Sequence, residues 1–491
     1  MKTLGIDIGS SSIKVAVFDA SNGNCLASAQ MPPDEMAIGS PQKGWAEQDP
    51  NTWWSYFVDA ARELSTLVDM GSIEAIGITY QMHGLVAVDD LGGVVRPSII
   101  WCDSRAVSLG NEALRMIGPE KCLERHLNSP GNFTASKLAW IKENEPELFS
   151  RISKIMLPGD YIAYKLSGDI TTTAQGLSEG ILWDFKEGEV SEVVLSHYGL
   201  NKGLLARQVP CFGIQAELSG EVAKALGMKE GTPITYRSGD QPNNAFSLNV
   251  LNPGEIAATA GTSGVVYGVS SSIAYDSQSR VNTFMHVNHT PSDPRLGVLL
   301  CINGTGILNS WMRRNATKNL TYLQMNELAS QAPAGSDGLT ILPFGNGAER
   351  VLGNQELGAH IQNINFNLHG TAHLLRAAQE GIAFSMQYGV EVMKTVGVTP
   401  KIIRAGIANL FQSDLFTQSV ADITGAAIEL YHTNGAIGAA RGAALGVGYF
   451  RNASEAFSMF KVEKVVEPNR NPMLQEAYES WNNCLKQLLI K

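Results

Sequence analysis

Two short segments, one near the N-terminus and one near the middle of the chain, could hold phosphate groups. Residues 5–19 (GIDIGSSSIKVAVFD) and residues 256–267 (IAATAGTSGVVY) each contain an apolar run, a turn of Gly, Ser and Thr, and a second apolar run. This pattern predicts a β-hairpin with a small hydroxyl-rich turn. Such a turn can direct N–H groups and hydroxyls at an anion, and glycine lets a phosphate approach the backbone. Two such loops indicate a duplicated fold that holds a phosphate chain between its halves, and they favour nucleotide-dependent chemistry.

Two aspartates could take part in that chemistry. Asp7 lies inside the first apolar run, where a carboxylate is costly to bury unless a cation meets it; beside a phosphate loop that cation would be Mg²⁺, held through water. A solvated turn aspartate is the alternative, and Lys14 could pair with a phosphate or point to solvent. Asp240 follows a predicted strand, and Pro242 restricts Gln241 to extended geometry. Asp240 could take the proton from an attacking hydroxyl, or it could cap a helix expected to begin at 243 or 244.

A polar segment after another predicted strand could contact a sugar or polyol. Residues 73–79 are rich in β-branched residues and lead into Gln-Met-His-Gly at 81–84. His83 could hydrogen-bond a polyol, and Met82 could form an apolar wall beside it. A lone histidine is more often a core or surface residue, so the residues alone leave both interpretations open.

The elements that must position these residues alternate along the chain. Strand-like runs at 232–239, 402–405 and 428–431 each lead into a turn or a helix, and residues 439–444 form an expected helix of almost entirely small residues. Alternating strands and helices predict α/β layers with mixed sheets. A chain of 491 residues is long enough for two or three domains. We place the boundary near residue 248, which gives domains 1–248 and 249–491 that pack directly on each other.

Composition excludes several classes of function. The net charge of −10 and the lack of a basic run argue against nucleic-acid binding. No stretch approaches the roughly 20 apolar residues of a membrane helix, and no signal peptide is expected. The six cysteines are scattered and form no C-x-x-C pair, which is typical of reduced thiols in a cytoplasmic protein.

The ordered set of motifs resembles the FGGY carbohydrate kinases over nearly the whole chain. The Gln-Met-His-Gly piece favours the branch of that family that phosphorylates D-xylulose. In chain order the matching pieces are DIGSS at 7–11, WAEQDPxxWW at 45–54, QMHG at 81–84, WxDxR at 101–105, KLxW at 137–140, LPxDY at 157–161, GD at 239–240 and GTSG at 261–264.

The resemblance implies two actin-like (ribonuclease H-like) domains with mixed sheets around a central cleft. The N-terminal domain would bind the sugar and carry the first phosphate loop, and the C-terminal domain would bind ATP. It implies transfer of the γ-phosphate of Mg–ATP to a ketose, with the 5-hydroxyl of D-xylulose as the expected acceptor. ATP and Mg²⁺ are therefore the expected cofactors, and a homodimer is compatible with the resemblance.

The resemblance also assigns roles to individual residues. Asp240 would be the catalytic base, and Asp7 would position Mg–ATP and bind Mg²⁺ through water. The expected sugar contacts are Met82, His83, Trp101, Asp103, Asp240 and Gln241. The expected nucleotide contacts are Gly9, Ser10, Ser11, Lys14, Gly261, Thr262, Ser263, Gly406 and Asn409.

Three segments depart from the family pattern. Asp240 is followed by Gln-Pro-Asn-Asn, where the xylulose branch usually has Asn-Ala-Ala-Gly and where Gln is closer to glycerol kinases. In residues 404–411 (RAGIANLF) only Gly406 keeps the glycine of a Gly-Gly-Gly-Ala adenine loop, and residues 346–352 keep only Glu-Arg of a Ser-Gly-Glu-Arg-Thr-Pro segment. The alternatives are a kinase for L-ribulose, L-fuculose or glycerol, an actin- or Hsp70-like ATPase without sugar transfer, and a sugar-binding regulator that has lost ATP.

Overall fold

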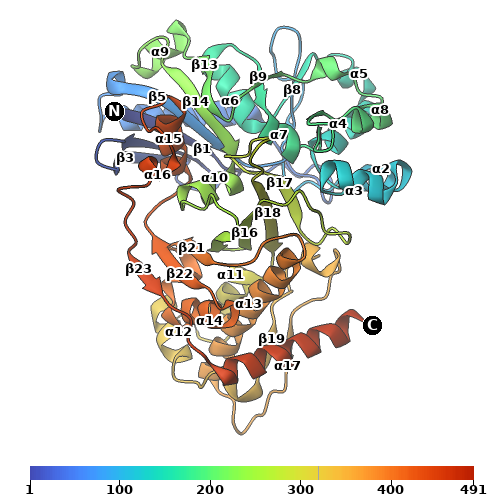
Figure 1. Ribbon diagram of the computed structural model, residues 1–491, viewed down its shortest axis with the longest axis vertical. Helices are drawn as coiled ribbons and strands as arrows, with labels where there is room; N and C mark the ends of the chain where they lie inside the picture. Colours follow the sequence, from blue (N-terminus) through green and yellow to red (C-terminus); the bar gives the residue numbers. More distant parts are fainter. Residues whose placement is uncertain (319, 491) are drawn as a thin grey trace. The chain divides into compact units, whose positions relative to one another are not determined.

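The computed structural model describes residues 1–318 and 320–490, which divide into two compact units (Figure 1). The first unit contains Met1–Asn249, Phe284–Asp293 and Thr433–Phe460, and the second contains Val250–Thr283, Pro294–His432 and the chain from Lys461 onward. These units differ from the contiguous domains 1–248 and 249–491 expected from the sequence. The difference arises because two segments of the C-terminal half pack with the first unit.

The first unit is built on a mixed six-stranded sheet in the order β13-β14-β5-β1-β2-β3. Strands β1, β5 and β14 run parallel to one another, whereas β2, β3 and β13 pair antiparallel with their neighbours. The predicted first hairpin is present, with Asp7 opposite Lys14. The strands are β1 (Lys2–Ile8), β2 (Ile13–Asp19), β3 (Asn24–Met31), β5 (Ile73–Tyr80), β13 (Phe212–Glu217) and β14 (Pro233–Gly239).

A helix of small residues, α15 (Gly435–Gly446), packs against this sheet. A Cβ atom on Gly5 would lie 1.8 Å from the carbonyl oxygen of Ala436, and one on Gly77 would lie 2.0 Å from that of Ala439. The glycines of the strands and the small side chains of the helix therefore allow an approach that larger residues would block. This contact is the reason why residues 433–460 belong to the first unit.

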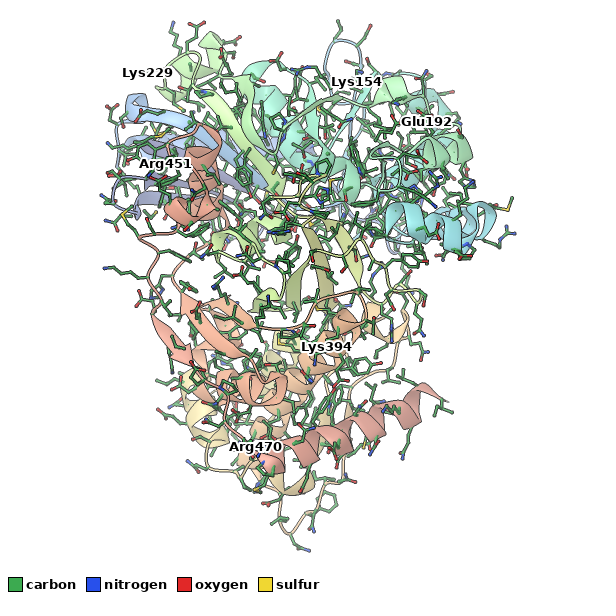
Figure 2. The ribbon with its side chains drawn as sticks, in the orientation of Figure 1. Lys154, Glu192, Lys229, Lys394, Arg451 and Arg470 are labelled. Carbon is green, nitrogen blue, oxygen red and sulfur yellow. The ribbon has the colours of Figure 1, made fainter. Side chains whose placement is uncertain are left out.

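The first unit also contains further helices and short strands. Its exposed charged side chains include Glu192, Lys229 and Arg451, which Figure 2 labels. The helices are α1 (Pro50–Ser65), α2 (Val107–Ile117), α3 (Pro119–His126), α4 (Thr134–Asn144), α5 (Pro146–Phe149), α6 (Pro158–Ser167), α7 (Ala174–Glu179), α8 (Glu192–Tyr198), α9 (Gly220–Leu226), α10 (Asp240–Ser247) and α16 (Ala453–Ala456). Short strands are β4 (Glu47–Gln48), β6 (Val86–Val88), β7 (Ser98–Ile99), β8 (Lys154–Met156), β9 (Thr171–Thr173), β10 (Trp183–Asp184), β11 (Glu189–Val190) and β12 (Arg207–Val209), with 3₁₀ turns at Met70–Ser72 and Lys202–Leu204.

The second unit is built on a mixed seven-stranded sheet in the order β17-β18-β16-β15-β21-β22-β23. The second predicted hairpin is present, with Ala260 opposite Gly264, and β15, β21 and β22 run parallel. The strands are β15 (Glu255–Ala260), β16 (Gly264–Ser270), β17 (Asn282–Met285), β18 (Leu296–Ile302), β21 (Ile402–Gly406), β22 (Ala427–Tyr431) and β23 (Lys464–Val466). The two large mixed sheets confirm the predicted α/β fold class.

Helices complete the core of the second unit. The long helix α13 is mostly buried, and the indole of Trp481 on α17 is buried in the same hydrophobic core and donates a hydrogen bond to the carbonyl of Ile341. The helices are α11 (Thr305–Asn315), α12 (Tyr322–Ala329), α13 (Thr371–Lys394), α14 (Asp414–Thr424) and α17 (Pro472–Leu489), with β19 (Thr340–Leu342), β20 (His360–Gln362) and 3₁₀ turns at Ser336–Gly338, Arg350–Leu352 and Asn409–Gln412. Among the described residues, no helix is both long and apolar enough to cross a membrane.

Candidate active site

Three parallel strands bring the predicted catalytic and sugar-binding residues to one edge of the first sheet. The register places Asp7 of β1 beside Thr79 of β5, and Thr79 beside Ser238 of β14. Met82–His83 and Asp240 follow β5 and β14 directly. The carboxyl ends of parallel strands are the usual place for a binding site in α/β proteins, because the chain turns there and leaves side chains accessible.

Asp7 occupies the penultimate position of β1. Burial raises the pKa of its carboxyl group to about 6, and the opposing Lys14 across the hairpin pulls the pKa back down. Lys14 itself is exposed, and the N–H of Gly9 closes the turn by donating to the carbonyl of Ser12 at 3.1 Å. The first phosphate loop is therefore formed as expected, and the assignment of Gly9, Ser10, Ser11 and Lys14 to phosphate binding stays a prediction.

Asp240 is the first residue of α10, and its backbone follows the end of β14 without a loop. Burial and then the charge of Asp7 raise the pKa of its carboxyl to about 7, while hydrogen bonds from Gln241 oppose the rise. The alternative of a cap for a helix beginning at 243 or 244 is wrong, because the helix begins at Asp240 itself. A carboxylate whose pKa lies near neutral pH is well matched to accept a proton from an alcohol.

The carboxylate of Asp7 also fits the predicted role of holding a hard divalent cation. Mg²⁺ is usually held by one or two carboxylates together with water and substrate phosphates. Among the described residues, no group of three or more His, Cys, Asp or Glu side chains could hold a metal ion by itself. Asp7 would supply the protein's carboxylate for this ion, and phosphate oxygens and water would supply the remaining ligands.

His83 stands at this edge in an unusual backbone conformation, with φ of 63°. Its ring packs edge-on against Phe133 with centroids 4.7 Å apart, and it lies 5.3 Å from the ring of Phe284. Met82 is nearly fully buried, and its side chain lies against Gly239, where an added Cβ would be 2.6 Å from Met82 Cγ. The structure thus places Met82 and His83 beside the start of α10, which is where a sugar contact was expected.

Trp101 and Asp103 differ in their exposure to solvent although they belong to one motif. The Trp101 side chain is 50% exposed, and its indole Nε1 donates to Oγ of Ser10 at 3.2 Å. Asp103 is fully buried and accepts hydrogen bonds from the N–H of Ala46 and from the backbone and guanidinium of Arg105. The donors of Ala46 and Arg105 bind both oxygens of Asp103, so Asp103 holds the loop together. The assignment of Asp103 as a direct sugar contact stays a prediction.

The second phosphate loop lies in the second unit and borders a cavity of about 560 Å³. The start of α11 holds this loop in place, because the N–H groups of Gly306 and Ile307 donate to the carbonyls of Gly261 and Thr262. A Cβ on Gly306 would lie 2.2 Å from the carbonyl oxygen of Gly261, so glycine is required there. The cavity is lined by this loop, by α11 and α12, and by the turn after β21; the lining includes Gly261, Thr262, Asn309, Arg314, Tyr322 and Asn409.

The divergent segment 404–411 still reaches this cavity. Gly406 ends β21, and Asn409 begins a 3₁₀ turn with φ of 53°. The Asn409 side chain faces the phosphate loop, since a Cβ on Gly261 would lie 3.4 Å from its Nδ2. Apart from glycine, asparagine is one of the few residues that tolerate this left-handed conformation. It can therefore replace a glycine of the usual glycine-rich loop.

Two buried residues beside His83 were not predicted as site residues. Glu179, at the end of α7, accepts a hydrogen bond from the His83 N–H, and Lys137 on α4 donates to the His83 carbonyl. Tyr322 and Asn326, which line the cavity from α12, were also missed. Lys137 was recognised only as part of a motif, and no local pattern marks the other three.

Comparison with known proteins identifies the family. The family model of the N-terminal domain of the FGGY family of carbohydrate kinases matches residues 2–247, and the model of the C-terminal domain of this family matches residues 256–447. The chain belongs to the FGGY family of carbohydrate kinases. This confirms the resemblance and the predicted class of enzyme, a kinase that phosphorylates a carbohydrate.

Individual relatives of this FGGY kinase are also informative. It is 28% identical to the xylulose kinase of Escherichia coli over 90% of this chain and 88% of that protein, and 27% identical to the xylulose kinase of Bacillus subtilis over 93% and 90%. Its fold matches a crystal structure of xylulose kinase from Rhodospirillum rubrum, with a TM-score of 0.89, 23% identity and 99% of both chains covered. Plasmodium falciparum glycerol kinase with ADP matches with a TM-score of 0.89 at 20% identity, covering 100% of this chain and 98% of that one.

Proposed function

We propose that this FGGY kinase transfers the γ-phosphate of Mg–ATP to the 5-hydroxyl of D-xylulose. The observation that carries the proposal is the position of Asp240, which follows a strand at the same sheet edge as Asp7 and His83. Burial and the charge of Asp7 raise the pKa of its carboxyl to about 7. The names of the curated relatives support D-xylulose as the acceptor, as does the Gln-Met-His-Gly segment at 81–84.

The proposed chemistry needs one proton transfer and one displacement at phosphorus. Asp240 accepts the proton of the sugar hydroxyl as that oxygen forms its bond to the γ-phosphorus and the bond from the γ-phosphorus to the ADP oxygen breaks. Asp7 would help to hold Mg²⁺, which would neutralise part of the phosphate charge when bound. Met82 and His83 orient the sugar so that the reacting hydroxyl meets Asp240.

The cavity of the second unit is the proposed nucleotide site. Its volume of about 560 Å³ lies within the roughly 300–1,000 Å³ range of small-molecule pockets. The backbone N–H groups and hydroxyls of the hairpin turn at 261–263 would donate hydrogen bonds to phosphate oxygens, since successive N–H groups in a turn form a binding site for anions. Tyr322 and Asn409 line the same cavity and would contact the adenine of the nucleotide.

A substrate panel tests the proposal. ADP release from Mg–ATP would be measured with ketoses, sugar acids and polyols, with D-xylulose, L-ribulose, L-fuculose and glycerol among them. Strong stimulation by D-xylulose alone supports the reaction and the substrate. Stimulation by a different compound overturns D-xylulose as the substrate and directs attention to Gln241. A glutamine after the aspartate is closer to glycerol kinases, and Gln241 hydrogen-bonds Asp240. ADP release that no acceptor stimulates overturns sugar transfer altogether.

A further inference from the structure

The backbone of His83 is held on both sides by the buried side chains of an acidic and a basic residue. The His83 N–H donates to Oε1 of Glu179 at 3.2 Å, and Nζ of Lys137 donates to the His83 carbonyl oxygen at 2.7 Å. Glu179 is 2% exposed and Lys137 is fully buried. We propose that Glu179 and Lys137 are positioning residues, which form a clamp that sets the His83 ring for sugar recognition.

The conformation of His83 explains why a clamp is needed. A φ of 63° is unfavourable for a residue with a Cβ atom, and such a residue keeps it only where its surroundings hold it there. Both backbone polar groups of His83 are held by the clamp, and its ring Nδ1 lies 3.1 Å from the backbone carbonyl of Glu179. With the proton on Nδ1, this contact fixes the ring's orientation as well as its tautomer.

The position of Glu179 is energetically unfavourable for a carboxylate. It is buried at the C-terminal end of α7, and its pKa is raised well above the ordinary value, first by burial and then by Asp240 and Asp160, with Lys137 opposing the rise. Lys137 gives a second hydrogen bond to the carbonyl of Ile100 at 3.0 Å, which ties the clamp to the Trp101 loop. A buried charge of either sign is costly unless it is paired and hydrogen-bonded.

The clamp also adjoins the catalytic base. A Cβ on Gly239 would lie 2.7 Å from Oε2 of Glu179 and 2.6 Å from Cγ of Met82, so Glu179 and Met82 both border the residue before Asp240. Because Glu179 is buried behind His83, it acts through His83 and Gly239 and does not touch the sugar itself.

A matched pair of substitutions separates the hydrogen bond from simple packing. Glu179→Met keeps a similar volume but removes the acceptor for the His83 N–H, whereas Glu179→Gln keeps an acceptor oxygen. We expect the Met variant to raise the KM for the sugar by roughly tenfold or more with little change in the KM for ATP, since it leaves a buried N–H unpaired. We expect the Gln variant to stay within about threefold of the wild type.

Two further variants complete the design. Glu380 is equally buried but lies on α13 in the second unit, and Glu380→Met should leave the KM for the sugar unchanged. In a His83→Ala background the ring is gone, so Glu179→Met should then add little. If Glu179→Met does not fold, Lys137→Met tests the other half of the clamp with the same readouts. Three results would each overturn the inference. The first is an unchanged KM for the sugar in Glu179→Met, and the second is a rise of the KM for ATP as large as that for the sugar. The third is that Glu179→Met raises the KM for the sugar as much in the His83→Ala background as in the wild type.

The inference rests on the proposed function, so the substrate panel on the wild type comes first. If a sugar other than D-xylulose is phosphorylated, the proposed substrate fails and the variants are compared on the sugar found. Hydrogen exchange at the His83 amide requires no substrate: it should be faster in Glu179→Met than in Glu179→Gln, and equal exchange in the two variants would contradict the clamp even if the proposed function holds.

Discussion

A Cβ atom on Gly435 would lie 2.4 Å from Oδ2 of Asp7. The first residue of α15 therefore lies directly against the carboxylate of the penultimate residue of β1, although the two residues come from opposite ends of the chain. Asn434 caps this helix by accepting from the N–H of Ile437, which fixes where the helix begins. Because Gly435 has no side chain, it leaves room for the carboxylate of Asp7.

Replacing Gly435 with Ala should displace the carboxylate of Asp7, because a short side chain cannot move away without leaving its site. We expect a lower kcat and a higher KM for Mg–ATP, with sugar binding nearly unchanged. Gly39→Ala in the same unit is a matched control, since its nearest contact would be an ordinary 3.4 Å. Wild-type kinetics in Gly435→Ala would show that Asp7 has no role that depends on its position.

Replacing Asp240 with Asn should remove the proton acceptor while keeping the shape of the side chain. We expect a loss of about 10²–10⁴ in kcat, the usual range for general base catalysis. Binding of the sugar, followed by calorimetry, should remain measurable because Met82 and His83 are unaltered. A turnover near that of the wild type would refute the assignment of Asp240 as the base.

The pH dependence of kcat/KM should report the same group. The pKa of Asp240 is raised to about 7, and a base must be deprotonated to act, so activity is full above this pH and is lost as the pH falls through it. Below the pKa we expect kcat/KM to fall about tenfold per pH unit. The residual activity of Asp240→Asn should lack this limb, and a wild-type profile that stays flat from pH 8 to pH 5 would contradict the prediction.

Local sequence patterns were sufficient for the framework of the site. An apolar run, a hydroxyl-rich turn and a second apolar run gave both hairpins, and the observed registers place Asp7 opposite Lys14 and Ala260 opposite Gly264. These features depend on residues close in sequence, so periodicity and turn composition reveal them. The small residues of α15 indicated close packing, but they could not reveal that the helix packs on the first unit.

The surroundings of His83 could not be predicted in the same way. Glu179 and Lys137 are 96 and 54 residues away from it, and only the folded sheet brings them together. The surroundings of Asp103 could not be predicted for a related reason: a motif shows which residue is present, whereas only the folded structure shows that its carboxylate is buried and bonded to Arg105.

Asn409 offers a test of the divergent adenine segment. Asn409→Gly and Asn409→Ala both remove the amide that faces the loop at Gly261, but only glycine adopts the φ of 53° without strain. If the amide contacts the nucleotide, both variants should raise the KM for ATP, and Ala should do so more because its left-handed backbone costs about 1–2 kcal/mol. The KM for the sugar should not change. An unaltered KM for ATP in both variants would exclude Asn409 from the nucleotide site.

Glu349 links the stability of the second unit to pH. Its buried carboxylate accepts the N–H groups of Asn303 and Gly304, which lead directly into α11, and burial raises its pKa to about 7. Between the unfolded value near 4.5 and about 7, only the folded state holds this proton. The contribution of Glu349 is therefore most favourable below the unfolded pKa and is lost as the pH rises through the folded pKa.

Glu349→Gln keeps an acceptor for these N–H groups and removes the titration. We expect the variant to gain stability relative to the wild type as the pH rises from 5 to 8, because only the wild type must then bury a charge. Urea unfolding of both proteins at several pH values measures this difference, in which the contributions of the other carboxylates cancel. A difference in unfolding free energy that does not vary with pH would mean that Glu349 keeps the same protonation in the folded and unfolded states.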